Sequence, residues 1–99
     1  MATAGQALPQ RRPDLVYRII EGETVILDRD GGVLHKLNPT ASFIWDCCDG
    51  TLSTDDIIDR LVKAFEIDRE TCRKDVIQAL NQFRSLNLLS STPFDQTKP

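Results

Sequence analysis

The junction at Asn38–Pro39 constrains the fold of this chain more than any other feature, because it joins a strand-like segment directly to a helix-like one. Asparagine is favoured just before a helix, where its side chain accepts a hydrogen bond from a free backbone N–H group. Proline is favoured at the first helical position, since its φ is already suitable and it lacks the N–H group that would stay unpaired there. Segments before the junction have the pattern of strands, and segments after it have the pattern of helices. This order predicts a small α+β domain.

Three strands are predicted before the junction. Residues 15–20 and 24–28 are rich in β-branched and other apolar residues, and Glu21–Gly22–Glu23 between them is typical of a tight turn. A second turn, at residues 29–32, contains adjacent glycines, which tolerate the positive φ of a short hairpin connection. It leads to the third strand, Val33–Leu37. We therefore expect a three-stranded antiparallel sheet with the second strand in the centre.

Three helices are predicted after the junction, from Pro39 to about Cys48, after Ser53 to Phe65, and after Asp68 to about Leu86. Apolar residues recur in them at spacings of three and four, which is the pattern of a buried helical stripe. The stripe residues are Ala41, Ile44, Trp45, Cys48, Ile57, Ile58, Leu61, Val62, Phe65, Cys72, Val76, Ala79, Leu80 and Phe83.

The helix ends are marked by capping residues. Ser53 and Asp56 resemble a capping box, and Asp68 is a suitable N-cap for the third helix. Asp49–Gly50 is expected to end the first helix because glycine readily adopts the left-handed conformation. Asn87 is expected to end the third helix. These signals predict short connections between the helices.

Length and composition predict one domain. The chain has 99 residues, of which 40% are hydrophobic, enough for one modest core. Residues 1–12 and 90–99 lack an apolar period, so we expect a flexible N-terminal arm, a folded domain over 13–89 and a flexible tail. The longest apolar runs are far shorter than the roughly 20 residues that span a bilayer, and no secretory signal is visible. The sequence therefore predicts a cytoplasmic protein that does not bind a membrane.

The residues that could perform catalysis are few. His35 is the only histidine, so a metal site with two histidines is excluded. Cys47 and Cys48 are adjacent on the first predicted helix and point about 100° apart, which is poor geometry for joint chelation, and with Cys72 they are expected to be reduced thiols. Most carboxylates lie at helix starts, where they complement the helix dipole. We therefore expect no catalytic site, no metal and no cofactor, while a thiol or metal enzyme using His35 and Cys47 or Cys48 stays an alternative.

An exposed strand edge is the most promising binding surface. The third strand is at an edge of the predicted sheet, where unpaired N–H and C=O groups can recruit another extended chain. A lateral face of the third helix adds a possible second wall to such a groove, with Arg73, Ile77, Leu80 and Arg84. There Ile77 and Leu80 would bury apolar side chains of a peptide, and the arginines would attract acidic ones. Alternatively, Ile77 packs on a neighbouring helix.

An ordered set of residues from about Val16 to Leu89 is similar to the PqqD-like proteins, the peptide chaperones of pyrroloquinoline quinone biosynthesis and related recognition elements of ribosomally made, post-translationally modified peptides. The residues that carry the resemblance are Glu23-Thr24-Val25-Ile26-Leu27-Asp28, Gly31-Gly32, Leu37-Asn38, Thr40-Ala41, Ile44-Trp45, Asp49-Gly50, Thr54, Ile57, Leu61, Asp75-Val76, Leu80 and Leu88-Leu89. The resemblance implies a winged-helix-like fold that binds the leader segment of a precursor peptide as an added strand. It also implies that the protein presents the precursor to a modifying enzyme, often a radical-SAM enzyme.

Carried onto this sequence, the resemblance implies peptide binding along the third strand and beside the third helix. The candidate residues are Val33, Leu34, His35, Lys36 and Leu37 on the strand and Asp75, Ile77, Leu80 and Arg84 on the helix, to which the lateral face adds Arg73. The identity of the precursor, the pathway and the oligomeric state stay open.

A winged-helix regulator that contacts DNA with the third helix is the alternative function. Its available cations are Arg69, Arg73, Lys74 and Arg84, against a formal net charge of −3 for the whole chain. Because DNA binding requires a basic face that displaces counterions, the charge favours a protein that does not bind nucleic acid.

Overall fold

The computed structural model describes residues 8–29 and 32–90. Three antiparallel strands precede three helices, which confirms the predicted α+β fold. The elements are β1 (Val16–Ile20), β2 (Glu23–Asp28), β3 (Val33–Leu37), α1 (Pro39–Asp46), α2 (Thr54–Phe65) and α3 (Arg69–Ser85). No helix within the described residues is long and apolar enough to cross a membrane.

The sheet has the order β1-β2-β3, with β2 in the centre as predicted. Glu21 and Gly22 both have positive φ, 53° and 83°, which is the conformation of a two-residue type I′ hairpin turn. This turn sets the register, so that Ile20 pairs with Glu23, and Thr24 pairs with Leu37 on the other side of β2. The second predicted turn lies partly outside the described residues.

The predicted caps are present. Asn38 Oδ1 accepts a hydrogen bond from Ala41 N at 2.8 Å, Ser53 and Asp56 form a reciprocal capping box, and Asp68 accepts from Thr71 N at 3.0 Å. Asn87, just after α3, has a left-handed φ of 62°, a conformation that asparagine tolerates better than most residues.

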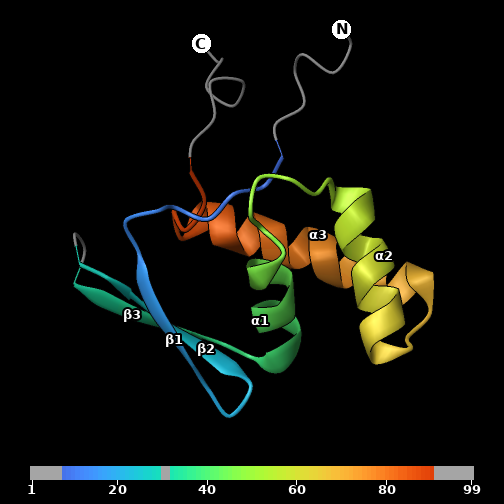
Figure 1. Cartoon of the computed structure of the whole chain (residues 1–99), viewed down its shortest axis with the longest axis horizontal. Helices are drawn as coiled ribbons and strands as arrows, with labels where there is room; N and C mark the ends of the chain where they lie inside the picture. The colour runs from blue at the N-terminus through green and yellow to red at the C-terminus, as the bar shows by residue number, and fades with distance from the viewer. Residues whose placement is uncertain (1–7, 30–31, 91–99) are drawn as a thin grey trace, which may run out of the picture.

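Helix α1 stands between the sheet and α2 (Figure 1). Among the described helices, only α1 has Cα atoms within 8 Å of the strands. The core lies around α1, where Trp45 and Ile44 are buried with Ile26 of β2 and Phe83 of α3. The strands are therefore held to the helices mainly through α1, and the sheet projects from the helical part as a wing.

The sheet is half covered. The side chains of Thr24, Ile26 and Leu37 on one face are buried. The opposite face carries a row formed by Val16, Leu27 and Leu34, which are cross-strand neighbours, and Val16 and Leu34 are exposed. Helix α1, which among the described helices is alone in contacting the strands, packs on the first face, and the second face exposes these apolar side chains to solvent.

The folded region begins before Pro13, where the sequence placed its start. Within the expected flexible arm, Arg11 N donates to Cys48 O at 2.8 Å, and Gly50 N donates to Pro9 O at 2.9 Å. Ser90, assigned to the flexible tail, donates through its backbone N–H to Gln10 O at 2.8 Å. We call residues 9–12 the N-terminal segment. It lies between the α1–α2 connection and the residues after α3. Helix α1 ends at Asp46 rather than at about Cys48, and Cys48 O accepts from Arg11 N of this segment.

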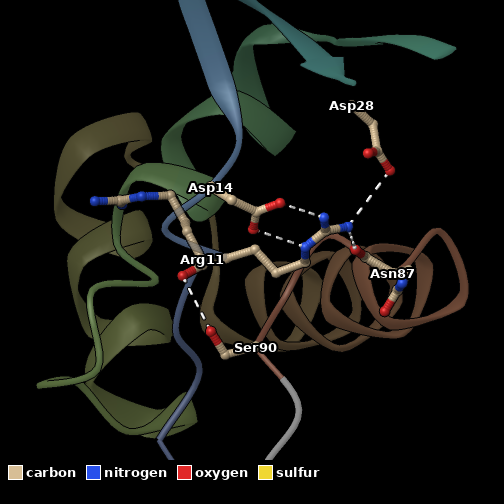
Figure 2. Close-up of polar contacts among 6 residues, drawn as sticks. Arg11, Asp14, Asp28, Asn87 and Ser90 are labelled. Carbon is tan, nitrogen blue, oxygen red and sulfur yellow. Dashed lines mark hydrogen bonds and ion pairs between the residues drawn. The ribbon is translucent and has the colours of Figure 1, made fainter. Parts of the chain in front are cut away.

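Arg12 links this N-terminal segment to both parts of the fold, and its partners Asp14, Asp28 and Asn87 are labelled in Figure 2. Its guanidinium contacts Asp14 at 2.5 Å, Asp28 at the end of β2 at 3.4 Å and the backbone oxygen of Asn87 at 2.8 Å. Arg12 therefore connects the sheet directly to the end of α3. Elsewhere these two parts are joined through α1, which packs against both.

Candidate functional site

The outer edge of β3 is the first part of the candidate site. Strand β3 is at one edge of the sheet, and in residues 8–29 and 32–90 no other segment forms a β-bridge with that edge. The binding surface predicted from the sequence requires this edge to be unpaired, and no segment of the described part of the chain pairs with it.

The type I′ turn determines which backbone groups of β3 point outward. In a two-residue hairpin the flanking pair, here Ile20 and Glu23, is hydrogen-bonded, and the ladder then alternates along each strand. Residues 24, 26 and 28 of β2 therefore direct their backbone N–H and C=O groups toward β3, where their partners are Leu37, His35 and Val33. The residues between these partners, Leu34 and Lys36, direct their backbone groups away from the sheet. The hydrogen bond of Thr24 is consistent with this arrangement. Its backbone N–H group points to the β3 side of the sheet and donates to Ser42 Oγ, just beyond the end of β3, at 2.8 Å.

The side chains of β3 divide between the two faces of the sheet. Leu34, 66% exposed, and Lys36, which pairs with Glu23 at 3.2 Å, lie on the open face. Val33 and the half-buried His35 lie on the helix side. Leu37 is also on that side but only 3% exposed, and its backbone groups point toward β2, where its C=O accepts from Ser42 Oγ at 3.1 Å. Neither its side chain nor its backbone is therefore open to a ligand at the outer edge.

A solvent-open groove of about 240 Å³ is the second part of the candidate site. It lies between the start of α1 and the middle of α3, and it includes Asn38, the residue directly after β3. The lining residues are Asn38, Thr40, Ala41, Ile44, Asp75, Gln78, Ala79 and Gln82. The α3 residues among them are three or four positions apart, so they form one stripe of the helix.

The structure places the predicted α3 residues in three different environments. Asp75 lines the groove. Leu80 is 3% exposed and belongs to the core. Arg73, Ile77 and Arg84 are exposed but do not line the groove, because at 100° per residue their common face lies about 170° around the helix from the lining stripe.

The groove residues on α1, and Gln78 and Gln82 on α3, were not predicted from the sequence. Gln78 and Gln82 have helical spacing from Asp75, which is a visible signal in the sequence. Their importance could not be recognised because the groove side of α3 depends on where α1 packs. The apolar Ile77 was a more conspicuous feature, but it lies on the opposite flank.

The cysteines are poorly suited to nucleophilic chemistry. Cys47, Cys48 and Cys72 are buried and form no disulfide. Burial raises the pKa of the Cys48 thiol to about 12 and also raises the pKa of Cys47, whereas a reactive cysteine needs a lowered pKa because the thiolate is the nucleophile. Within residues 8–29 and 32–90, no three His, Cys, Asp or Glu side chains are grouped as a metal site.

The cations of α3 give the DNA-binding alternative no support. Arg69 forms an ion pair with Asp59 of α2, and Arg84 contacts Asn81 on its own helix at 3.4 Å. Around the helix, Glu70 lies only about 60° from Arg73, so a carboxylate interrupts the face that carries these arginines.

Solved structures with the same fold include two complexes with leader peptides. One is TbiB1 in complex with the TbiA(beta) leader peptide, with a TM-score of 0.74 and 23% identity, covering 84% of this chain and 96% of that chain. Another is lasso peptide synthetase B1 complexed with the leader peptide, with a TM-score of 0.75 and 21% identity, covering 86% of this chain and 100% of that chain. At these identities the similarity establishes the fold.

A third structure is the PqqD part of Methylobacterium extorquens PqqCD, described as a stand-alone recognition element for ribosomally synthesized and post-translationally modified peptides. Its TM-score is 0.70 at 18% identity, with 89% of this chain and 94% of that chain covered. No curated protein sequence matches this chain. The profile of the family described as "Coenzyme PQQ synthesis protein D (PqqD)" matches residues 23–89, which is more than half of the sequence and includes β2, β3 and all three helices. The chain therefore belongs to the PqqD family.

Proposed function

We propose that this protein is a non-catalytic chaperone that binds the leader segment of a ribosomally made precursor peptide and presents it to a modifying enzyme. The observation that carries this proposal is the open outer edge of β3 next to the groove between α1 and α3. An open edge supplies backbone pairing, and a neighbouring groove supplies a place for side chains.

The leader segment would add a fourth strand to the sheet. Its backbone would pair with the outward N–H and C=O groups of Leu34 and Lys36. Every second side chain would then point to the helix side, where Val33, His35 and the groove lie. The residues after β3 would therefore select the peptide sequence, and the strand itself would supply affinity that depends little on sequence.

Two kinds of observation support the proposal besides the geometry. The chain belongs to the PqqD family, and two structures with the same fold hold leader peptides. The raised pKa values of the buried thiols argue against catalysis by these cysteines. The enzyme that receives the peptide would be a separate protein, for which a radical-SAM enzyme is our candidate, and the encounter would occur in the cytoplasm, where the precursor is made.

Titration of ¹⁵N-labelled protein with the precursor peptide encoded beside its gene tests this function. We expect the amide signals of residues 33–37 to shift and the amides of Leu34 and Lys36 to become protected from hydrogen exchange. The outer amides of β1 serve as an internal control and should not become protected. Absence of binding below about 1 mM, a standard free energy of only about −4 kcal/mol, would count against the proposal.

The enzyme alternative predicts a different result. If a thiol performs chemistry, replacing Cys47 or Cys48 by alanine should abolish turnover of the precursor. In the chaperone proposal, the same variants keep peptide affinity within about threefold, provided that they fold, because neither side chain lies at the β3 edge or in the groove.

A further inference from the structure

Among the described residues that line the groove, Asp75 alone carries a formal charge. Its side chain is half-buried, and in the described part of the chain it forms no hydrogen bond or ion pair. The residues three and four positions away on α3 are Thr71, Cys72, Gln78 and Ala79, so no cation on its own helix is placed to pair with it. A ligand cation in the groove would therefore find a carboxylate that can accept a charge-assisted hydrogen bond.

The rest of the lining suits a long side chain with a polar end. Ala41, Ile44 and Ala79 supply apolar surface, and Thr40, Gln78 and Gln82 supply hydrogen-bonding groups. Lysine and arginine combine an aliphatic stem with a charged head, so they match a groove that is apolar along part of its surface and acidic at one point.

The start of α1 does not convert the groove into an anion site. Free N–H groups at a helix start can bind anions, but Pro39 has no N–H group, and the N–H group of Ala41 already donates to Asn38 Oδ1 at 2.8 Å. The carboxylate of Asp75 on the facing helix would also repel an anion.

We propose that the groove between α1 and α3 is a subsite for one lysine or arginine side chain of the bound peptide, with Asp75 as the residue that selects it. This inference rests on the proposed function and adds the class of peptide that the site prefers. Because Asn38 belongs to the lining and follows Leu37 directly, the basic residue occupies a helix-side position of the peptide near the C-terminal end of β3.

A selection from a random twelve-residue peptide display library tests the subsite, and it does so even while the natural precursor is unidentified. The wild-type protein, Asp75→Asn and Asp75→Lys are each used as bait, with Glu70→Gln as the matched control. Glu70 lies on the same helix about 140° away from Asp75, so its replacement by glutamine removes the same charge as Asp75→Asn without touching the groove. Circular dichroism and amide spectra confirm that each variant is folded.

We expect the wild type and Glu70→Gln to enrich lysine or arginine at one fixed position, Asp75→Asn to lose this preference and Asp75→Lys to enrich aspartate or glutamate there. For a selected peptide, replacing the basic residue by norleucine should weaken binding to the wild type about tenfold, the effect of one lost charged hydrogen bond. The same replacement should have little effect on binding to Asp75→Asn, which is the signature of a direct pair.

The outcomes separate this inference from the proposed function. Peptides that shift the amides of residues 33–37 but carry no position-specific basic residue overturn the subsite and leave the proposed function standing. A basic preference that persists in Asp75→Asn also overturns it. If no peptide is enriched by a folded protein, the proposed function and the subsite are both rejected.

Discussion

Ser42 is a small residue whose hydroxyl connects three elements of the fold. Its side chain is 7% exposed. The hydroxyl accepts a hydrogen bond from Thr24 N at 2.8 Å and donates one to Leu37 O at 3.1 Å. It thereby connects β2 and the end of β3 to α1, directly beside the proposed binding edge.

Replacing Ser42 by alanine should lower the free energy of unfolding by about 2 kcal/mol, because it removes the partner of a buried N–H group. Urea denaturation measures the change. Ser85→Ala, at the exposed end of α3, is the control and should change stability by less than about 0.5 kcal/mol. Equal effects of the two substitutions would show that the Ser42 bridge contributes nothing.

Asp68 makes stability depend on pH. The N–H group and the hydroxyl of Thr71 donate to its carboxylate and hold the pKa of Asp68 below its ordinary value. A carboxyl group with a lowered pKa in the folded state stabilises the fold above its unfolded-state pKa of about 3.9. This contribution is lost as the pH falls through the lower folded-state pKa.

Asp68→Asn should therefore differ from the wild type only when the carboxylate is ionised, since asparagine caps the helix equally well but does not titrate. We expect the variant to have a melting temperature a few degrees lower at pH 7, and the difference to disappear by about pH 2. Thermal denaturation followed across this range measures it. A difference that is the same at pH 7 and pH 2 would exclude the carboxylate as its source.

At the scale of elements, the sheet has two edges, and the surroundings distinguish them. Strand β1 also exposes apolar residues, and Ile19 is 59% exposed. The groove that borders the end of β3 includes no residue of β1 in its lining. We therefore propose that the peptide pairs with β3, although backbone groups are available on both edges.

Proline substitutions separate the two edges. Leu34→Pro removes an outward N–H group from β3, and Ile19→Pro removes one from β1, and proline is tolerated at such edge positions because the lost N–H group is not part of the sheet. We expect peptide affinity to fall at least tenfold in Leu34→Pro and to change less than twofold in Ile19→Pro, measured by isothermal titration with the precursor leader. The reverse result would move the site to β1.

At the scale of the whole molecule, the N-terminal segment holds the wing to the helices. Arg11 extends over the rings of Tyr17 and Trp45, at 5.9 and 5.3 Å from their centroids, and donates to the backbone oxygen of Asp46 at 2.7 Å. Arg12 spans from Asp28 to Asn87 (Figure 2). Residues far apart in the sequence are thereby joined by one short segment.

A chain that begins at Pro13 should consequently be less stable by about 2 kcal/mol or more, because it loses several hydrogen bonds and both arginines. The amides of Gly50 and Ser90, whose acceptors are Pro9 O and Gln10 O, should exchange with solvent faster than in the full chain. Arg12→Gln is a milder variant that should cost about 1–2 kcal/mol. An unchanged unfolding curve for the shortened chain would show that the segment only rests on the surface.

The sequence by itself determined the elements of this protein, because their signals are local. The Asn38–Pro39 junction, the Ser53–Asp56 capping box and the Glu21–Gly22 turn act within a few residues, so strand order, helix starts and the open edge of β3 could be predicted. The placement of Val33–Leu37 at that edge followed from the same meander.

Only the tertiary structure decided which side of α3 faces the groove and which terminal residues belong to the fold. Periodicity shows that Asp75, Gln78 and Gln82 share one stripe, but the position of α1 selects that stripe over the one with Ile77. The N-terminal segment has no apolar period, and its order comes from hydrogen bonds to Cys48, Leu88 and Ser90. Such contacts join residues distant in the sequence, and no local pattern encodes them.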